Sequence, residues 1–226
     1  PLGIAGAIFL SEIAPYYLRA TLKPVIELLA GIPSIVYGFI GATLLVQYLV
    51  PTFDLLKGKS FLAGSIILGI MALPIIISIS DDALKAVPRE LKEASLAVGA
   101  TKWETIKKVT FPTAISGISA AVIMGMGRAI GETMAVSLVV GNVMRIPIPP
   151  FDIFESGSTL TSIIALEMGE ASGIQTDALF ACGVILFVIV GSMSIASNIL
   201  KERVEKKFKG GWTKIENWYW IYNWVY

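Results

Sequence analysis

Two charged side chains lie inside a long apolar stretch of the chain. Arg128 and Glu132 occur in GMGRAIGETMAV, roughly midway along the apolar segment 113–144. A charge at bilayer depth costs ~2.5–3.5 kcal/mol, so such residues normally face a protein interior and find partners there. On one helix the spacing i, i+4 places both side chains on the same face, within reach of each other.

This pair of residues has two interpretations. In the first, it is a self-neutralising ion pair that locks the helix against a neighbour. Gly127 and Gly131, four residues apart, would let that second helix come close. In the second, Arg128 faces a transport path and offers its planar guanidinium group to an oxyanion, while the carboxylate of Glu132 holds that group in place. Spacing alone does not decide between them.

The composition excludes most other chemistry. The 226 residues include no histidine and one cysteine, Cys182, which removes histidine acid–base catalysis, Ser–His and Cys–His nucleophiles, zinc sites and disulfide scaffolds. Hydrophobic residues make up 55% and charged residues 15%, and the mean hydropathy is +0.74, values typical of a membrane protein. The formal net charge of +1 says little about partners, and we expect no nucleic acid among them.

Five apolar segments must position the charged pair. They are 1–14, about 24–50, which Pro33 interrupts and Pro51 closes, 61–80, 113–144 and 178–198. About 20 apolar residues cross ~30 Å of hydrocarbon, so every segment but the first is long enough to span a membrane. Lipid requires a satisfied backbone and nothing here alternates like a barrel strand, so the segments are predicted to be helices. We therefore predict an all-α, polytopic transmembrane protein.

Basic residues gather in two of the connections. The stretch 81–111 and the tail after residue 200 each carry six Lys or Arg residues, whereas 145–177 carries one basic residue against five acidic ones. The positive-inside rule places the first two regions in the cytoplasm and the third outside. The chain begins with Pro1, directly in an apolar run, and we expect its first span to be missing.

The cytoplasmic connection has internal order of its own. Pro88 precedes a helical stretch that Gly99 ends. Thr101 is followed three residues later by Glu104, the spacing of a capping box at the start of a second helix. The sequence therefore predicts a helix, a tight turn at Gly99–Ala100 and a second helix from Thr101.

This connection resembles a loop of the permease subunits of ABC importers. That family carries the pattern E-A-A-x3-G-x9-I-x-L-P, and the present chain matches its spacing throughout, with Ser for Ala, Val for Ile and Phe for Leu. In the family, the short helix docks into a cleft on the ATPase subunit and transmits its closure to the spans. The resemblance assigns this coupling role to five residues of the loop, Glu93, Ala94, Ser95, Gly99 and Pro112.

Five further stretches resemble the phosphate importer permeases, PstC type. They are PLGIAGAIFLSEIAP, LLAGIPSIVYGF, LPIIISISDDALKAVP, GRAIGETMAV and LTSIIALEMGEA. The sister PstA-type subunit shares GRAIGET, but the following MAV and the later ALEMGEA favour the PstC type. The resemblance covers about residues 1–209 and implies that Arg128 and Glu132 contact phosphate during its passage.

The resemblance also implies the architecture and the partners. The expected fold is that of a type I ABC importer permease (MetI-like) over residues 1–209, with a coupling loop at 81–111 and an aromatic tail of unknown role at 210–226. The chain is expected in the cytoplasmic membrane as a multi-pass subunit that is not an enzyme and binds no cofactor. Its expected partners are a homologous PstA-like permease, two PstB-like ATPase subunits that bind ATP and magnesium, a PstS-like binding protein and membrane lipid.

Three alternatives stay open at this point. The chain could be the permease of another oxyanion importer, for sulfate or molybdate, or the PstA-type partner subunit. It could also be a membrane-embedded enzyme with Arg128 and Glu132 as a catalytic pair, although that leaves the patterned loop unexplained. Monohydrogen or dihydrogen phosphate can donate a hydrogen bond to Glu132 and sulfate cannot, which suggests a basis for selectivity. Glu12 and Glu27, near helix ends, are expected to be interhelical partners rather than substrate ligands.

Overall fold

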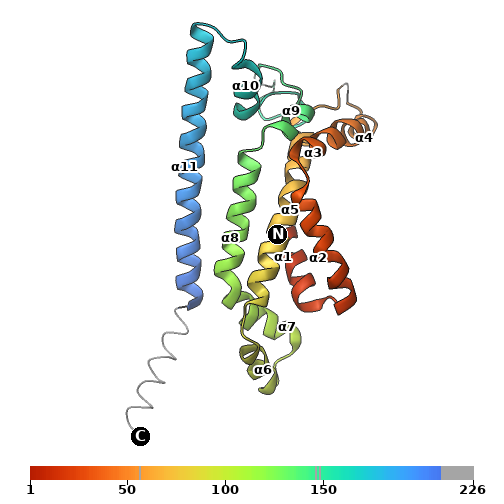
Figure 1. Cartoon of the computed structure of the whole chain (residues 1–226), viewed down its shortest axis with the longest axis vertical. Helices are drawn as coiled ribbons and strands as arrows, with labels where there is room; N and C mark the ends of the chain where they lie inside the picture. The colour runs from red at the N-terminus through yellow and green to blue at the C-terminus, as the bar shows by residue number, and fades with distance from the viewer. Residues whose placement is uncertain (56, 146, 148, 210–226) are drawn as a thin grey trace. The chain divides into compact units, whose positions relative to one another are not determined.

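The computed structural model describes residues 1–55, 57–145, 147 and 149–209. These residues form helices joined by short connections, with one isolated bridge between Gly141 and Gly157 and no strand in the described ranges (Figure 1). The all-α prediction is therefore confirmed. The aromatic tail predicted at 210–226 lies outside the described residues.

Two compact units make up the chain. The first comprises Pro1–Ile26, Ile75–Met124 and the described residues from Ser194 onwards, and the second comprises Glu27–Pro74 and Gly125–Met193. The helices in chain order are α1 (Leu2–Ile8), α2 (Tyr16–Gly31), α3 (Ser34–Ile40), α4 (Val46–Thr52), α5 (Phe61–Lys85), α6 (Arg89–Ala97), α7 (Lys102–Thr105), α8 (Phe111–Ile130), α9 (Met134–Val140), α10 (Leu160–Glu167) and α11 (Ile174–Lys209). Three π-helical turns continue α1, α3 and α7, namely η1 (Phe9–Ile13), η2 (Gly41–Leu45) and η3 (Ile106–Thr110).

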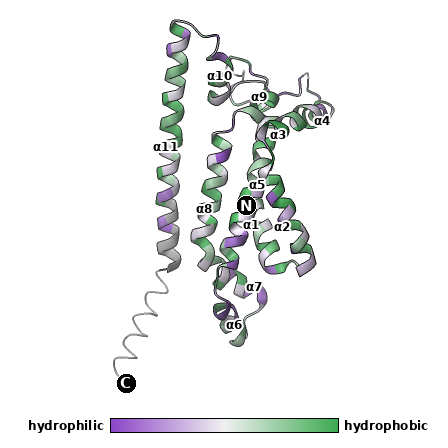
Figure 2. Cartoon of the chain, in the orientation of Figure 1, coloured by the Kyte–Doolittle hydropathy of each residue, from purple (hydrophilic) through white to green (hydrophobic). Residues whose placement is uncertain are grey.

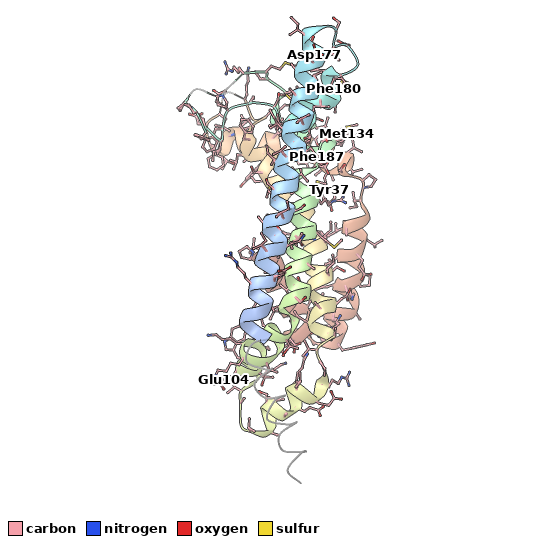
Figure 3. All side chains as sticks on the ribbon, turned by 90° about the vertical axis from the view of Figure 1, so that its left-hand side faces the viewer. Tyr37, Glu104, Met134, Asp177, Phe180 and Phe187 are labelled. Atoms are coloured by element: carbon pink, nitrogen blue, oxygen red, sulfur yellow. The ribbon has the colours of Figure 1, made fainter. Side chains whose placement is uncertain are left out.

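Among the described residues, four helical stretches are long and apolar enough to cross a membrane, as predicted. They are Ser34–Thr52, Phe61–Lys85, Lys102–Ile130 and Ile174–Ile199, and the N-terminal stretch Leu2–Ile13 is shorter. Figure 2 shows hydrophobic residues along these helices and hydrophilic ones recurring on α6 and α7. Phe180 and Phe187 project from α11 with most of their surface exposed (Figure 3), as expected of a helix facing lipid or another subunit. The protein is therefore a multi-pass membrane protein.

The predicted boundaries of the second apolar segment are wrong. The chain is already helical from Tyr16, and α2 ends at Gly31, so the span begins only at Ser34. Pro33 causes the interruption because it has no N–H to continue a helix and disfavours helical geometry in the residue before it. Its ψ of 138° places it outside the helix, at the N-cap of α3.

Small residues bring helices of the first unit close together. Its buried cluster combines α1, α5 and α8 with the chain just after α5, through Ala7, Leu84, Val87, Ala114 and Ile118. At Gly117 of α8, a Cβ atom would lie 2.4 Å from the Cβ of Ala83 on α5. In lipid, close backbone approach of this kind is a main source of helix association, since apolar burial favours neither state.

The second unit is built around α3, α5 and α9. Tyr37, Leu49, Ala63, Ile67, Met71, Ala135 and Val139 form its buried cluster. Gly38 allows α3 to lie against α9, because a Cβ atom there would come 2.7 Å from the Cα of Ala135. This contact fixes the start of α9, which bears directly on the candidate site.

We expect Gly117→Ala to destabilise the protein by ~1–3 kcal/mol, the usual cost of overpacking a close contact. The new Cβ atom cannot lie 2.4 Å from the Cβ of Ala83, so α5 and α8 must move apart. The thermal unfolding midpoint in detergent measures this effect. Gly69→Ala on α5 is the matched control, because a Cβ atom there meets nothing within 4 Å, and an equal loss in both variants would contradict the packing argument.

Candidate functional site

Arg128 and Glu132 do not lie on one helix. Helix α8 ends at Ile130, and α9 begins at Met134 after a break at Gly131–Thr133. The prediction of one helical segment over 113–144, with the two residues one turn apart, is therefore wrong. The helix breaks at Gly131 because glycine is a poor helix former. The carboxylate of Glu132 is engaged elsewhere, since its Oε1 accepts a hydrogen bond of 3.2 Å from the N–H of Ala135 at the start of α9.

The guanidinium group of Arg128 has no carboxylate partner among the described residues. No ion pair within 4.0 Å joins it to Glu132 or to another described acid, and its Nε atom is buried without a hydrogen-bond partner. A buried polar atom of this kind is rare and calls for a specific explanation, such as a ligand, a water molecule or another chain. The self-neutralising ion pair of the first interpretation is therefore absent from this structure. The second interpretation is wrong in one respect as well, because the carboxylate of Glu132 does not hold the guanidinium group of Arg128 in place.

Tyr37 is the neighbour through which α3 contributes to this region. Its side chain is buried, its hydroxyl donates a hydrogen bond of 2.8 Å to the carbonyl of Leu29, and it interacts electrostatically with Arg128. The hydroxyl proton is thus engaged by the backbone of α2. Tyr37 was not predicted as a functional residue, because an aromatic residue inside an apolar segment is ordinarily just a packing residue.

Gly127, beside Arg128, lies on an open face. A Cβ atom at this position would meet nothing within 4 Å, and the nearby side chains of Met126 and Met134 are exposed. The close helix approach predicted from Gly127 and Gly131 is therefore not made by the described part of this chain. The open face leaves room beside the guanidinium group for a ligand or a second subunit.

Helix α10 is tied to the break between α8 and α9. The hydroxyl of Thr161 donates a hydrogen bond of 3.1 Å to the backbone carbonyl of Glu132. A capping box at Thr159 and Ser162 starts α10 and so positions Thr161. This contact was not predicted from the sequence, because a long-range hydroxyl–carbonyl hydrogen bond leaves no local sequence signal.

The predicted helix–turn–helix loop is confirmed. Helix α6 follows Pro88, Gly99 adopts a left-handed φ of +89°, and Thr101 and Glu104 form the capping box that starts α7. Figure 1 shows α6 and α7 beyond the ends of α5 and α8, and we call residues 89–105 the hairpin. Its two helices are joined by a 3.0 Å hydrogen bond between the hydroxyls of Ser95 and Thr105.

The hairpin exposes apolar as well as charged side chains. Glu93, Ala94 and Gly99 are exposed, Ser95 is half-buried, and Pro112 lies in the first turn of α8. Three apolar residues that were not predicted as functional are also exposed, namely Leu96, Val98 (84% exposed) and Trp103 (61% exposed). Exposed apolar groups gathered on a small polar element are typical of a protein docking surface.

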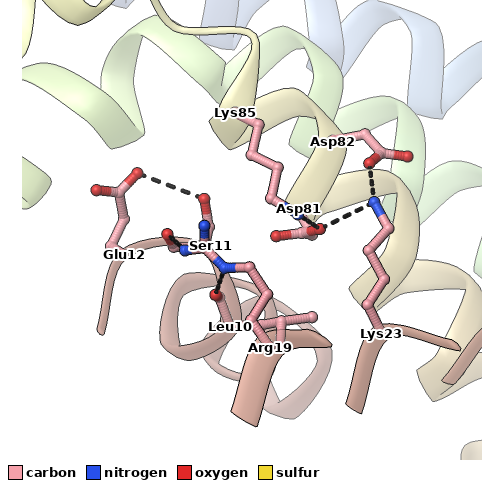
Figure 4. A network of polar contacts seen from close by, with 8 residues as sticks. All are labelled: Leu10, Ser11, Glu12, Arg19, Lys23, Asp81, Asp82 and Lys85. Carbon is pink, nitrogen blue, oxygen red and sulfur yellow. Dashed lines mark hydrogen bonds and ion pairs between the residues drawn. The ribbon is translucent and has the colours of Figure 1, made fainter. Parts of the chain in front are cut away.

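A network of charged groups surrounds the end of α5. Asp81 is completely buried and lies 3.2 Å from the Nζ of Lys23 and 2.5 Å from that of Lys85, while Lys23 also contacts Asp82 at 2.5 Å (Figure 4). The hydrogen bond to Asp82 and the charge of Asp81 raise the pKa of Lys23 above its usual value. The loop was predicted to begin at Asp81 and Asp82. Instead, α5 continues to Lys85, because these ion pairs neutralise its polar last turn.

Glu12 is an interhelical partner, as expected from the sequence. Its Oε1 accepts a hydrogen bond of 2.6 Å from the Nζ of Lys92 on α6. Within the described ranges, no cluster of three or more metal-ligating side chains occurs.

We expect Thr101→Ala to loosen the start of α7, because the N–H of Glu104 then loses its acceptor, the threonine hydroxyl, at 3.2 Å. Hydrogen exchange at the Glu104 amide should accelerate about fivefold, a typical effect of losing a threonine N-cap. Thr101→Ser retains a hydroxyl and should exchange like the parent. Unchanged exchange in the alanine variant would show that the capping box does not hold the hairpin.

Comparison with known protein families gives a consistent result. A family described as binding-protein-dependent transport system inner membrane component matches residues 3–210. The chain is 49% identical over 191 residues to the probable ABC transporter permease protein YqgH of Bacillus subtilis, covering 84% of this chain and 61% of that protein. It is 37% identical over 226 residues to the phosphate transport system permease protein PstC of Pasteurella multocida, covering 92% and 70%. The chain thus spans 61–70% of the length of these two relatives.

Solved structures share the fold at lower identity. A chain of the MetNI methionine ABC transporter, in an inward facing conformation, superposes with a TM-score of 0.67 at 19% identity, covering 90% of this chain and 86% of that one. A chain of a bacterial ABC transporter that imports the polysaccharide alginate gives a TM-score of 0.57 at 15% identity, covering 90% and 72%. The expected MetI-like permease architecture is therefore confirmed.

Proposed function

Because this chain belongs to the binding-protein-dependent transport system inner membrane components, we propose that it is the PstC-type permease subunit of an ATP-driven phosphate importer. The observation that carries the assignment of an anionic substrate is the buried Nε of Arg128, which has no partner among the described residues. The names of its PstC relatives point to the same substrate.

Arg128 is suited to an oxyanion that arrives and leaves. A guanidinium group neutralised by a fixed carboxylate gains little from a substrate anion, whereas an unneutralised one gains a charge-assisted, bidentate contact. The separation of Arg128 from Glu132 by the helix break therefore favours transport over a locked ion pair. The open face at Gly127 gives the anion, or the second permease that completes the path, access to this position.

Glu132 supplies the selectivity in this proposal. One of its oxygens accepts the N–H of Ala135, but a carboxylate has further lone pairs for a substrate that brings a proton. Phosphate at neutral pH carries such a proton, while sulfate meets only negative charge. The same guanidinium group could serve a sulfate or molybdate importer, so competition between these anions separates the alternatives.

The hairpin is the proposed docking element for the ATPase subunit. Glu93, Ala94, Ser95, Gly99 and Pro112 carry the family pattern, and the exposed Val98 and Trp103 offer apolar contacts beside it. ATP and magnesium would bind to two separate PstB-like subunits, so this chain makes no covalent chemistry. A PstS-like protein would deliver phosphate outside the cytoplasmic membrane, and a PstA-like permease would complete the pathway in an alternating-access cycle.

Arg128→Ala should lower ATP-dependent phosphate uptake by about tenfold or more, which corresponds to at least ~1.4 kcal/mol of lost stabilisation for the passing anion. The experiment uses the full-length protein reconstituted in vesicles with its partner permease, ATPase and binding protein. Labelled phosphate is followed with excess sulfate and molybdate as competitors.

Arg128→Lys is the matched variant, since it keeps the charge but loses the planar fork, and intermediate uptake is expected. Recovery of the ATPase subunit with each variant verifies assembly. Uptake unaffected by Arg128→Ala would reduce the arginine to a structural role, and competition by sulfate or molybdate would reassign the substrate.

Glu132→Gln should reduce the preference for phosphate over sulfate by about tenfold, because sulfate no longer meets a fixed negative charge. Glutamine retains a side-chain oxygen for the N–H of Ala135, so α9 should start normally. Competition by sulfate against labelled phosphate uptake measures the change. An unaltered preference would remove Glu132 from the selectivity mechanism.

A further inference from the structure

Polar contacts, rather than apolar burial, hold α6 in place. None of the nine residues of this helix is buried. In the part of the chain that the structure describes, its polar side-chain contacts are the hydrogen bond between Ser95 and Thr105 and the ion pair between Lys92 and Glu12. The first stays inside the hairpin, and the second leads out of it.

The Lys92–Glu12 contact is close and shielded from water. Lys92 Nζ lies 2.6 Å from Glu12 Oε1, with side chains that are 22% and 11% exposed. An exposed ion pair contributes little, but separating a shielded pair leaves an uncompensated charge in a poorly solvated site. The pair therefore resists displacement of α6 relative to Glu12 more strongly than exposed charges would.

Glu12 lies in a segment that is itself held to α2. It belongs to the π-helical turn η1, whose freed carbonyls need donors from elsewhere. Arg19 of α2 supplies them, with Nε 2.7 Å from the carbonyl oxygen of Leu10 and Nη2 donating to that of Ser11 (Figure 4). A force applied to the Glu12 carboxylate is thus shared between α1 and α2.

We propose that the Lys92–Glu12 ion pair is the positioning contact through which movement of the docked α6 reaches α1 and α2. This inference rests on the proposed role of the hairpin in ATPase docking. The path runs from Lys92 to Glu12 and then through the backbone of η1 to Arg19. The ion pair joins two residues that are 80 positions apart in the sequence. It therefore connects α6 to η1 independently of the backbone connections of the hairpin to α5 and α8.

The test compares charge-reversed and charge-swapped complexes. Lys92→Glu and Glu12→Lys are each expected to lower the number of phosphate ions transported per ATP hydrolysed by about tenfold, within the usual range of coupling between distant sites. The double variant Glu12→Lys with Lys92→Glu restores an attractive pair and should return to within about twofold of the parent. Lys92→Arg should behave like the parent. All variants are made in the full-length protein within the reconstituted complex.

The transport-to-hydrolysis ratio distinguishes coupling from stability, because the ratio counts only assembled, hydrolysing complexes. Reversal of the exposed Arg145–Glu155 pair, with atoms 3.0 Å apart, is the matched control and should leave the ratio unchanged. An unaltered ratio in both single variants, or a swapped pair that does not recover, overturns the proposal. If the charge-reversed variants do not assemble, the transport-to-hydrolysis ratio is measured for Glu12→Gln and Lys92→Gln instead and interpreted in the same way. Loss of assembly in these two variants also overturns the proposal, since the ion pair is then only structural.

A second readout separates this inference from the proposed substrate. In a Cys182→Ser background, Tyr16→Cys places a thiol on the exposed first residue of α2. The rate at which maleimide labels this thiol should change on addition of ATP in the parent and in the charge-swapped double variant. In the single charge variants, the rate should not respond to ATP. If the complex takes up no phosphate but shows this labelling pattern, the substrate assignment is contradicted and the role of the Lys92–Glu12 ion pair is supported. Labelling that responds to ATP in every variant overturns the proposed role of the ion pair.

Discussion

One hydrogen bond at a helix break controls the chemistry of the candidate site. The N–H of Ala135 donates to the carboxylate of Glu132 and so begins α9 where the apolar pattern alone would continue α8. The contact of Ala135 with Gly38 then holds α9 against α3. Because the carboxylate is engaged at one helix start, the guanidinium group of Arg128 keeps a charge that no described acid neutralises.

In the first unit, close packing of small residues and ion pairs hold the helices together. Close packing between small residues, such as Gly117 and Ala83, holds α5 to α8, while ion pairs hold the polar elements at their ends. Asp81 is fully buried between two lysines, and Glu12 is paired with Lys92. Apolar burial gives little force between helices in lipid, so directional polar contacts can determine which elements move together. Helix α6 has no buried residue, and yet the Lys92–Glu12 ion pair holds it firmly at one point.

Sequence patterns predicted correctly the elements that depend on residues only a few positions apart. Span lengths followed from runs of apolar residues, and the hairpin followed from Gly99 and the Thr101–Glu104 capping box. Such patterns failed at 113–144, where the i, i+4 spacing of Arg128 and Glu132 indicated one helix with the two side chains within reach of each other. They also misplaced the start of the second span, although Pro33, which interrupts it, was recognised in the sequence.

The sequence by itself determined the class of the protein, the order of its apolar helices and the residues able to meet an anion, because hydropathy and residue type are local properties. Only the tertiary structure decided what those residues contact. Glu132 accepts a hydrogen bond from α9, Glu12 pairs with Lys92, and Arg128 has no described acid beside it. A polar side chain in an apolar environment takes whichever partner the packing of other helices brings within about 3 Å, and distances across 80 residues of chain are not encoded in local spacing.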